Sequence, residues 1–123
     1  IPAKRGISTR VEMRNPDPSC NPYLAITVML KAGLDGIKNK IMPPKQVNCN
    51  IYEMTSKEKE DSGIDSLPGS LEEALKELQN DQVIMDALGS HALKRFIEAK
   101  ELEWNDYRTK ITPWEIKHYL TKF

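Results

Sequence analysis

Three charged residues near the start of the sequence have types and spacing that suit phosphate and metal chemistry. Arg10, Glu12 and Arg14 alternate with Val11 and Met13. In a strand, alternate side chains share one face and lie about 7 Å apart. A Glu carboxylate can bind a hard cation such as Mg²⁺, and an Arg guanidinium can bind a phosphate or carboxylate through two hydrogen bonds. The alternative is a solvated face on which these charges only neutralise one another.

The other residue types that carry chemistry are few and widely separated. His91 and His118 have no companion at the spacing of a metal site or a catalytic pair, so we interpret both as surface helix residues. Cys20 and Cys49 are too few for a disulfide scaffold, and their spacing to the histidines does not fit structural zinc. We interpret them as reduced thiols, which favours a cytoplasmic location.

The element that must position the charged residues is a strand at the N-terminus. The alternation of apolar and charged residues predicts one apolar and one charged face, and Pro16 and Pro18 should end the strand. A lone strand has no ladder partner, and the sequence shows no second convincing strand. We therefore expect residues 1–15 to pair with something outside this chain. Because the sequence starts with Ile1, a fragment of a longer protein is the favoured interpretation.

A long helix should follow the strand. Asn21 is a suitable cap with Pro22 at the first helical position, and apolar residues then recur at steps of three and four. Gly33 and Gly36 lie inside this helix, where each costs about 1 kcal/mol relative to Ala. We therefore expect the helix to pack closely against another backbone at these two positions.

Capping signals predict the remaining helices. Capping boxes begin at Thr55, Ser70 and Thr112, Asp81 can cap a further helix, and Gly89 should separate two helices. The fold class we expect for the isolated chain is mainly α, with one N-terminal strand and then about five helices.

The composition narrows the possible partners. Among 123 residues, 18 Lys and Arg balance 18 Asp and Glu. A chain without net charge or a basic stripe has no electrostatic reason to bind nucleic acid or an anionic membrane. The longest uncharged run, residues 18–30, is too short to span a bilayer. We expect neither nucleic acid nor membrane as a partner.

Two long stretches resemble bacterial type I glutamine synthetase near the end of its catalytic domain. They are Arg10-Val-Glu-Met-Arg14-Asn-Pro-Asp-Pro-Ser-Cys-Asn-Pro-Tyr-Leu-Ala25 and Ala32-Gly-Leu-Asp-Gly-Ile-Lys-Asn-Lys-Ile41. Shorter matches follow in the same order at 63–68, 88–91 and 99–104, so the resemblance covers essentially the whole chain. The tail at 103–108 and 114–115 is most similar to the Gram-positive-like subdivision of this family.

The resemblance implies an activity and roles for the charged residues. The family ligates ammonia to glutamate with ATP through γ-glutamyl phosphate, assisted by two divalent cations, Mg²⁺ or Mn²⁺. By resemblance, Glu12 is a ligand of the nucleotide-side cation and Arg10 contacts ATP phosphate. Arg14 then holds the glutamate γ-carboxylate and the transferring phosphoryl group. The family's other active-site residues lie upstream, so the chain alone should be inactive and should hold no cofactor.

The resemblance also implies how the chain fits into an assembly. The parent would be an α+β catalytic domain in a homo-oligomer of two hexameric rings, with active sites between subunits. The expected segments are an active-site strand at 1–15, a long helix at 19–41, a loop and short helix at 42–69, helices at 70–111 and a C-terminal assembly helix at 112–123. Tyr52 resembles an adenylylated tyrosine of the other subdivision, but Glu53 and Met54 do not match that context, so we do not expect this modification.

Two alternatives remain open at this point. The chain could be a stand-alone helical interaction or assembly module without catalysis; translating the DNA upstream of Ile1 would distinguish it from a fragment of the enzyme. The last helix, with Ile116, Tyr119, Leu120 and Phe123 on one face, could instead fold back on the helix that carries Leu93 and Trp104.

Overall fold

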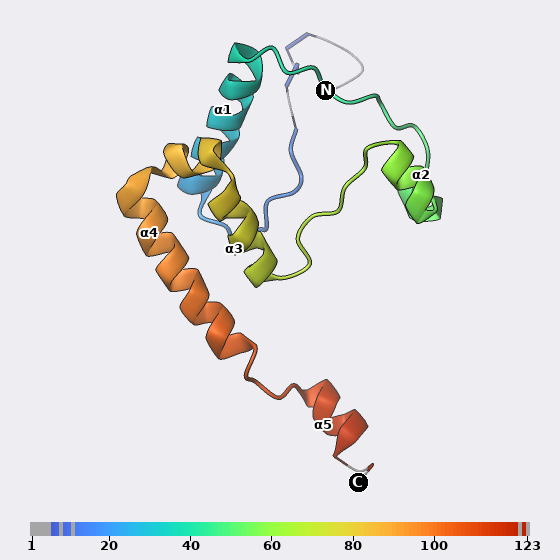
Figure 1. Ribbon diagram of the computed structural model, residues 1–123, viewed down its shortest axis with the longest axis vertical. Coiled ribbons are helices and arrows are strands. Elements are labelled where there is room, and N and C mark those ends of the chain that lie inside the picture. The colour runs from blue at the N-terminus through green and yellow to red at the C-terminus, as the bar shows by residue number, and fades with distance from the viewer. Residues whose placement is uncertain (1–5, 8, 11, 121, 123) are drawn as a thin grey trace.

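The computed structural model describes residues 6, 7, 9, 10, 12–120 and 122, and this part of the chain is helical (Figure 1). In order, the elements are α1 (Pro22–Lys38), the 3₁₀ turn η1 (Ile51–Glu53), α2 (Ser56–Asp61), α3 (Leu71–Asn80), α4 (Gln82–Tyr107) and α5 (Pro113–Tyr119). The prediction of a mainly α chain is therefore confirmed. None of the described helices is long and apolar enough to cross a membrane.

The predicted N-terminal strand is wrong. Residues 9, 10 and 12–15 have no regular secondary structure, and no strand occurs elsewhere in the described part of the chain. Ser8 and Val11, which the prediction included, lie outside the described residues. A strand satisfies its backbone donors and acceptors through a neighbour, and the described residues offer no such neighbour. The alternation of apolar and charged residues is real, but alternation alone does not form a ladder.

Three helices form a cluster in which α1 and α3 each pack against α4 (Figure 1). The most buried side chain of the described residues is Leu75 on α3, which is 5% exposed. Ser70 caps α3 by accepting the Glu73 N–H at 3.2 Å, whereas the Glu73 carboxylate accepts the Gly69 N–H at 2.7 Å. Only half of the predicted capping box is therefore present. Asp81 caps α4 as predicted, accepting the Ile84 N–H at 3.0 Å.

Gly89 divides α4 into two parts. Its backbone angles, φ 71° and ψ 156°, are non-helical, and they lie in a region that only glycine adopts without strain. Two helical segments meet at this position, and α4 changes direction there (Figure 1). The predicted boundary at Gly89 is thus present as a bend between two helical segments.

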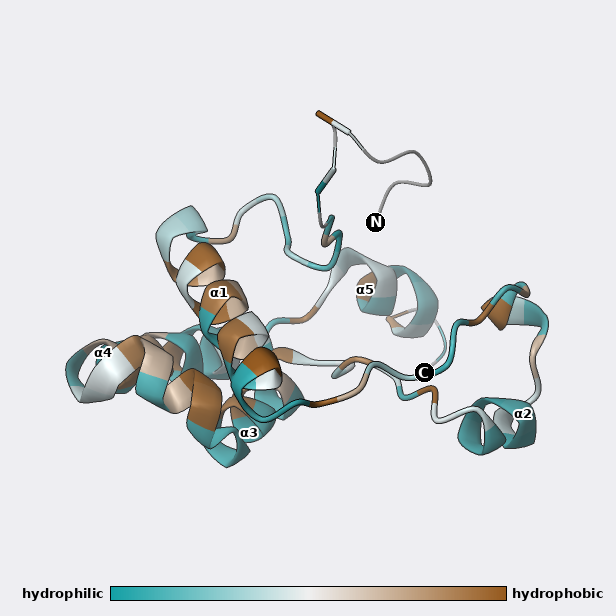
Figure 2. Ribbon diagram, turned by 90° about the horizontal axis from the view of Figure 1, so that it is seen from above, coloured by the Kyte–Doolittle hydropathy of each residue, from teal (hydrophilic) through white to brown (hydrophobic). Residues whose placement is uncertain are grey.

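Helix α1 begins as predicted and is apolar on more than one side. The Asn21 side chain accepts the N–H groups of Tyr23 and Leu24 at 3.0 and 3.3 Å. Large side chains remain exposed along the helix; they are Tyr23, Ile26, Leu30, Leu34 and Ile37. Figure 2 shows hydrophobic residues of α1 in brown along the length of the helix. A helix that is apolar around its circumference is typical of one buried on all sides. This exposed face of α1 therefore remains available for burial.

The close packing expected at Gly33 and Gly36 is not present. A Cβ added at either position would meet no heavy atom of the described chain within 4 Å. These two glycines therefore lower the helix propensity of α1 without allowing a closer contact in this structure.

The surface area of the chain is large for its mass. It exposes 11301 Å², whereas a compact monomer of 14.0 kDa exposes about 6,700 Å². Part of the excess comes from the arm that includes α2 and from α5, since neither helix belongs to a packed pair (Figure 1). Because α5 lies beyond the end of α4, the structure does not have the last helix folded back on α4.

Candidate functional site

The charged segment is joined to α1 by a tight turn. The Asp17 carboxylate accepts the Ser19 N–H at 2.7 Å, and the Asp17 carbonyl accepts the Cys20 N–H at 3.0 Å. The next residue is the α1 cap, Asn21. Hydrogen bonds from the Ser19 hydroxyl and then from its backbone N–H lower the pKa of Asp17. This carboxylate is therefore committed to the turn and ionised at neutral pH.

Arg10, Glu12 and Arg14 form one ion-paired cluster. The Arg10 Nε donates to Glu12 Oε1 at 2.7 Å, and Arg10 Nη2 forms a still closer ion pair with the same oxygen. The Arg14 Nη2 donates to the other oxygen, Glu12 Oε2, at 3.2 Å. The side chains of Arg10, Glu12 and Arg14 are 55%, 38% and 89% exposed. The structure thus brings together all three predicted site residues, although not on a strand.

This cluster can bind anions and contribute one ligand to a cation. Two guanidiniums offer forked donors of the kind that bind phosphate. Mg²⁺ takes about six oxygen ligands, and Glu12 can supply only one carboxylate. Among the described residues, no group of three or more His, Cys, Asp or Glu side chains could hold a metal ion. The donor set therefore fits a shared cation site, completed by groups beyond this cluster.

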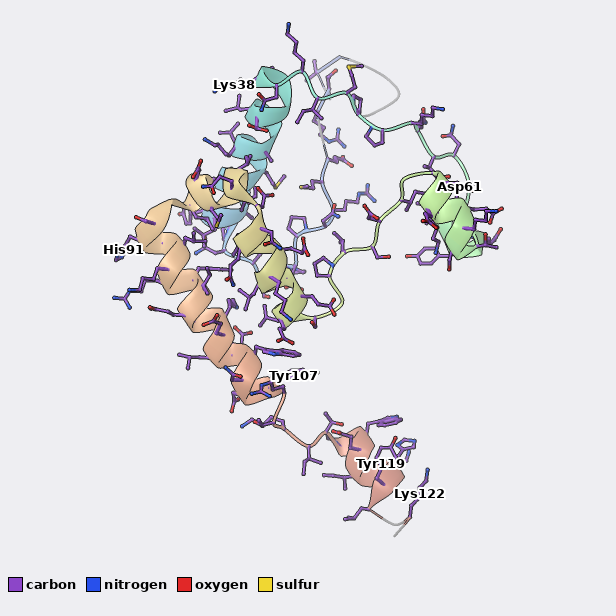
Figure 3. The ribbon with its side chains drawn as sticks, in the orientation of Figure 1. Lys38, Asp61, His91, Tyr107, Tyr119 and Lys122 are labelled. Carbon is purple, nitrogen blue, oxygen red and sulfur yellow. The ribbon has the colours of Figure 1, made fainter. Side chains whose placement is uncertain are left out.

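The histidines do not join the cluster. His91 lies near the bend of α4 (Figure 3), far along the chain from Arg10. His118 stacks on Trp114 with ring centroids 4.2 Å apart, and its Nδ1 lies 2.7 Å from the Trp114 carbonyl oxygen. Tyr119 and Lys122 are next to this stack, with the Lys122 ammonium 5.5 Å from the Tyr119 ring centre (Figure 3). Both histidines are helix residues, as predicted.

The two cysteines are free and exposed. Cys49 Sγ is 3.7 Å from Met54 Sδ, beside η1. Cys20 instead lies at the edge of a cavity of about 550 Å³ between α1, α3 and α4. Apolar side chains that are distant in sequence line this cavity, including Leu24, Leu78 and Phe96. The sequence analysis did not predict it, because no local pattern indicates which helices meet.

Two glutamates outside the cluster have a lowered pKa for a structural reason. The Thr55 N–H and then its hydroxyl donate to the Glu58 carboxylate, which lowers the pKa of Glu58. The Thr112 N–H, at 2.7 Å, and its hydroxyl do the same to the pKa of Glu115. These are the predicted capping boxes of α2 and α5, and both are complete. The lowered pKa values of Glu58 and Glu115 therefore result from hydrogen bonds that stabilise the first turns of α2 and α5.

Comparison with known proteins places these observations in a family. Residues 1–119 match the family described as glutamine synthetase, catalytic domain. The chain is 56% identical over 120 residues to glutamine synthetase of Thermotoga maritima, which covers 98% of this chain and 27% of that protein. It is 51% identical over 123 residues to that of Thermus thermophilus, and 48% identical to that of Staphylococcus aureus. The chain thus spans little more than a quarter of the length of these relatives.

Solved structures agree with the sequence comparison. The chain is similar to a GmaS–ADP complex, with 34% identity and a TM-score of 0.74 over 85% of this chain and 23% of that one. It is also similar to GmaS without ligand, with a TM-score of 0.73 over 89% of this chain and 25% of that one. The two GmaS structures therefore share the helical arrangement of this chain.

Proposed function

This chain belongs to the glutamine synthetase catalytic-domain family, and from that membership we propose that it forms the C-terminal portion of an ATP-dependent glutamate–ammonia ligase. The observation that carries the proposal is the family match over residues 1–119. The excess surface of the chain supports its being one part of a larger catalytic domain. The rival idea, a helical module without catalysis, would leave Arg10, Glu12 and Arg14 as a solvated, ion-paired surface, and the substitutions described below distinguish the two.

We propose that this cluster serves the phosphoryl-transfer half of the reaction. The γ-carboxylate of glutamate would attack the γ-phosphorus of ATP, forming γ-glutamyl phosphate and releasing ADP, and ammonia would then displace phosphate. Arg10 would bind ATP phosphate oxygens, and Arg14 would hold the γ-carboxylate and the phosphoryl group in line. Such positioning and charge neutralisation provide most of the catalysis of phosphoryl transfer.

Glu12 is the residue of this chain that would hold a divalent cation, Mg²⁺ or Mn²⁺. When bound, the cation supplies positive charge that offsets the charge of the ATP phosphates. Glu12 fits this role because its side chain is 38% exposed and its carboxylate is adjacent to the two guanidiniums that would bind phosphate. The other ligands would come from parts of the domain outside this chain, so we expect the 123-residue chain by itself to be inactive.

Substitutions in the full-length protein test these roles. Removing one group that stabilises transition-state charge lowers kcat by about 10²–10³, and we expect losses of this size for Glu12→Ala and Arg14→Ala. Arg10→Ala should mainly raise the KM for ATP. Lys57→Ala, in the charged and exposed helix α2, is the control and should leave γ-glutamyl hydroxamate formation unchanged. Wild-type kcat and KM in Glu12→Ala or Arg14→Ala would refute that residue's role.

We propose that α5 links subunits of the assembly, which by family resemblance would be two hexameric rings. Support comes from its exposed apolar residues, Trp114, Ile116 and Tyr119, and from the exposed C-cap Leu120; α5 does not form a packed pair with α4. Side chains of this size gain about 1.5–3 kcal/mol each on full burial. Deleting residues 112–123 from the full-length protein should leave folded hexamers or smaller species in light scattering. A surviving twelve-subunit particle would exclude this role.

The free cysteines support a reducing, cytoplasmic location for the protein.

A further inference from the structure

Two sulfur atoms lie side by side on the loop between α1 and α2. The Cys49 thiol donates a weak hydrogen bond to the thioether of Met54, with Sγ 3.7 Å from Sδ. A thioether accepts such a bond through a lone pair on its sulfur, so this lone pair is directed toward Cys49. Two soft donor atoms therefore converge on one point of the loop.

The turn η1 brings the two sulfurs together. Asn50 caps this turn: its side-chain oxygen accepts the Tyr52 N–H at 3.2 Å, and its carbonyl oxygen accepts the Glu53 N–H at 3.1 Å. The Met54 N–H then donates to the Ile51 carbonyl at 3.3 Å. Because all of these bonds are local, the separation of the sulfurs does not depend on a distant part of the fold.

The sulfur pair is open to solvent on an acidic surface. Cys49 is exposed and Met54 is half-buried. Both line a pocket of about 360 Å³ beside η1 and α2, together with the carboxylates of Glu53, Glu58 and Asp61. Clustered negative charge raises the local concentration of cations. A metal cation can therefore reach the two sulfurs and is attracted to them.

We propose that Cys49 and Met54 form a binding site for Cu(I), in which the metal ion takes the place of the thiol proton. Thiolate and thioether sulfurs are ligands that select soft ions such as Cu(I). Two sulfurs 3.7 Å apart, each about 2.3 Å from one metal ion, enclose an angle of about 107° at the metal. Both can therefore bind the same ion without a change of the backbone. On binding, the thiol proton passes to solvent and the sulfur forms a bond to Cu(I), with no transfer of electrons.

The donor set favours Cu(I) over Zn²⁺. A structural Zn²⁺ site takes four ligands from Cys, His and carboxylate side chains. Among the residues that the structure describes, no group of three or more such side chains could hold a metal ion. Cu(I) needs fewer ligands, and a small thiol or water can fill a further position. The inference does not depend on the proposed function, because neither Cys49 nor Met54 belongs to the charged cluster.

Competition with a Cu(I) chelator, under reducing and oxygen-free conditions, measures the affinity of the 123-residue chain. Met54→Leu should weaken Cu(I) binding by about tenfold or more, because a second ligand on the same turn acts at a millimolar or higher effective concentration. Met42→Leu, at an exposed methionine of the same loop, is the control and should not change the affinity. Cys49→Ser should weaken binding more than Met54→Leu does, whereas Cys20→Ser should leave the site intact.

Methionine methyl signals test whether the thioether binds the metal. In the chain labelled with ¹³C at its methionine methyl groups, one equivalent of Cu(I) should shift the Met54 signal in NMR and leave the Met42 signal in place. One equivalent of Zn²⁺ should leave both signals in place. An unmoved Met54 signal with Cu(I), or wild-type affinity in Met54→Leu, would reduce Cys49 to a single thiol and overturn the inference. An equal shift with Zn²⁺ would overturn the preference for a soft ion.

The full-length protein extends the test to the assembled domain. The methyl signal that disappears in Met54→Leu identifies Met54 there, and Cu(I) buffered by the chelator should shift this signal. An unshifted signal would mean that the rest of the domain covers the sulfur pair, which would overturn the site in the enzyme. Either outcome leaves the proposed roles of Arg10, Glu12 and Arg14 to the kcat measurements.

Discussion

Helices α3 and α5 begin alike and end in different surroundings. Each starts behind a hydroxyl residue, Ser70 or Thr112, that accepts a backbone N–H of its first turn. Yet α3 packs against α4 through the buried Leu75, whereas α5 has no packed partner among the described helices and Trp114 on it is 58% exposed. The capping box is complete in α5 and only half-formed in α3.

The difference shows that a cap determines where a helix begins, whereas a packed face holds the helix in the fold. A cap satisfies backbone donors that the first turn leaves free, so it fixes where a helix begins. Burial of apolar area supplies most of the free energy that holds a helix in a fold. The helix with the weaker cap is the one that is packed, so α3 depends mainly on burial and α5 depends on its cap.

Truncating one side chain on each helix should give the largest difference between α3 and α5 in the free energy of unfolding. Leu75→Ala removes the most buried side chain of the described chain, and such changes cost about 2–5 kcal/mol. Ile116→Ala removes an exposed side chain from α5 and should leave the free energy of unfolding nearly unchanged in the 123-residue chain. Urea unfolding followed by circular dichroism at 222 nm measures both. Equal losses would mean that α5 is packed in solution.

Replacing one glycine in α4 and one in α1 by alanine extends the comparison to the helix backbone. Gly89→Ala forces a side chain into a backbone region that costs about 1–3 kcal/mol, so it should lower the free energy of unfolding. Gly33→Ala meets no neighbour within 4 Å and should stabilise α1 by about 0.5–1 kcal/mol. The same urea experiment checks both signs. A destabilising Gly33→Ala would indicate a close contact that the structure lacks.

The parts of the fold that were predictable from sequence are those encoded locally. Asn21, Thr55 and Thr112 act through hydrogen bonds to residues two or three positions away, so their motifs predicted helix starts correctly. Gly89 acts through its own backbone angles and was likewise predictable as a boundary. The strand was not, because a strand depends on a partner that no pattern within residues 8–14 specifies.

The candidate site shows the same division. The chemistry of Arg10, Glu12 and Arg14 follows from residue type and spacing, and their proximity needs no distant contact. That both Glu12 oxygens are occupied by arginine is a side-chain geometry, which alternation in sequence does not determine. The cavity beside Cys20 depends on contacts between α1, α3 and α4, so it too became visible only in the structure.

Removing the cap of each helix should give a smaller effect that again differs between α3 and α5. Loss of a Ser or Thr cap costs about 0.5–2 kcal/mol, and for α5 no burial compensates this loss. Thr112→Ala should therefore abolish most helical ¹³Cα secondary shifts at residues 113–119. Ser70→Ala should leave those at residues 71–80 largely intact, because Leu75 still holds α3 against α4. If both helices melted equally, burial of Leu75 would not be the stabilising feature of α3.

Acidification should weaken the cap of α5, and we expect this effect to be the smallest of those predicted here. The pKa of Glu115 is lowered by the Thr112 N–H and hydroxyl, so the folded helix binds the proton less readily than the unfolded chain. Its contribution is therefore fully present above the unfolded pKa of about 4.3 and is lost as the pH falls through the lower folded value. The ¹³Cα secondary shifts of residues 113–119 should fall in this acidic range, and those of α2 should follow through Glu58. Glu115→Gln, which does not titrate, should flatten this part of the α5 profile, whereas an unchanged profile would mean that another group controls the acid response.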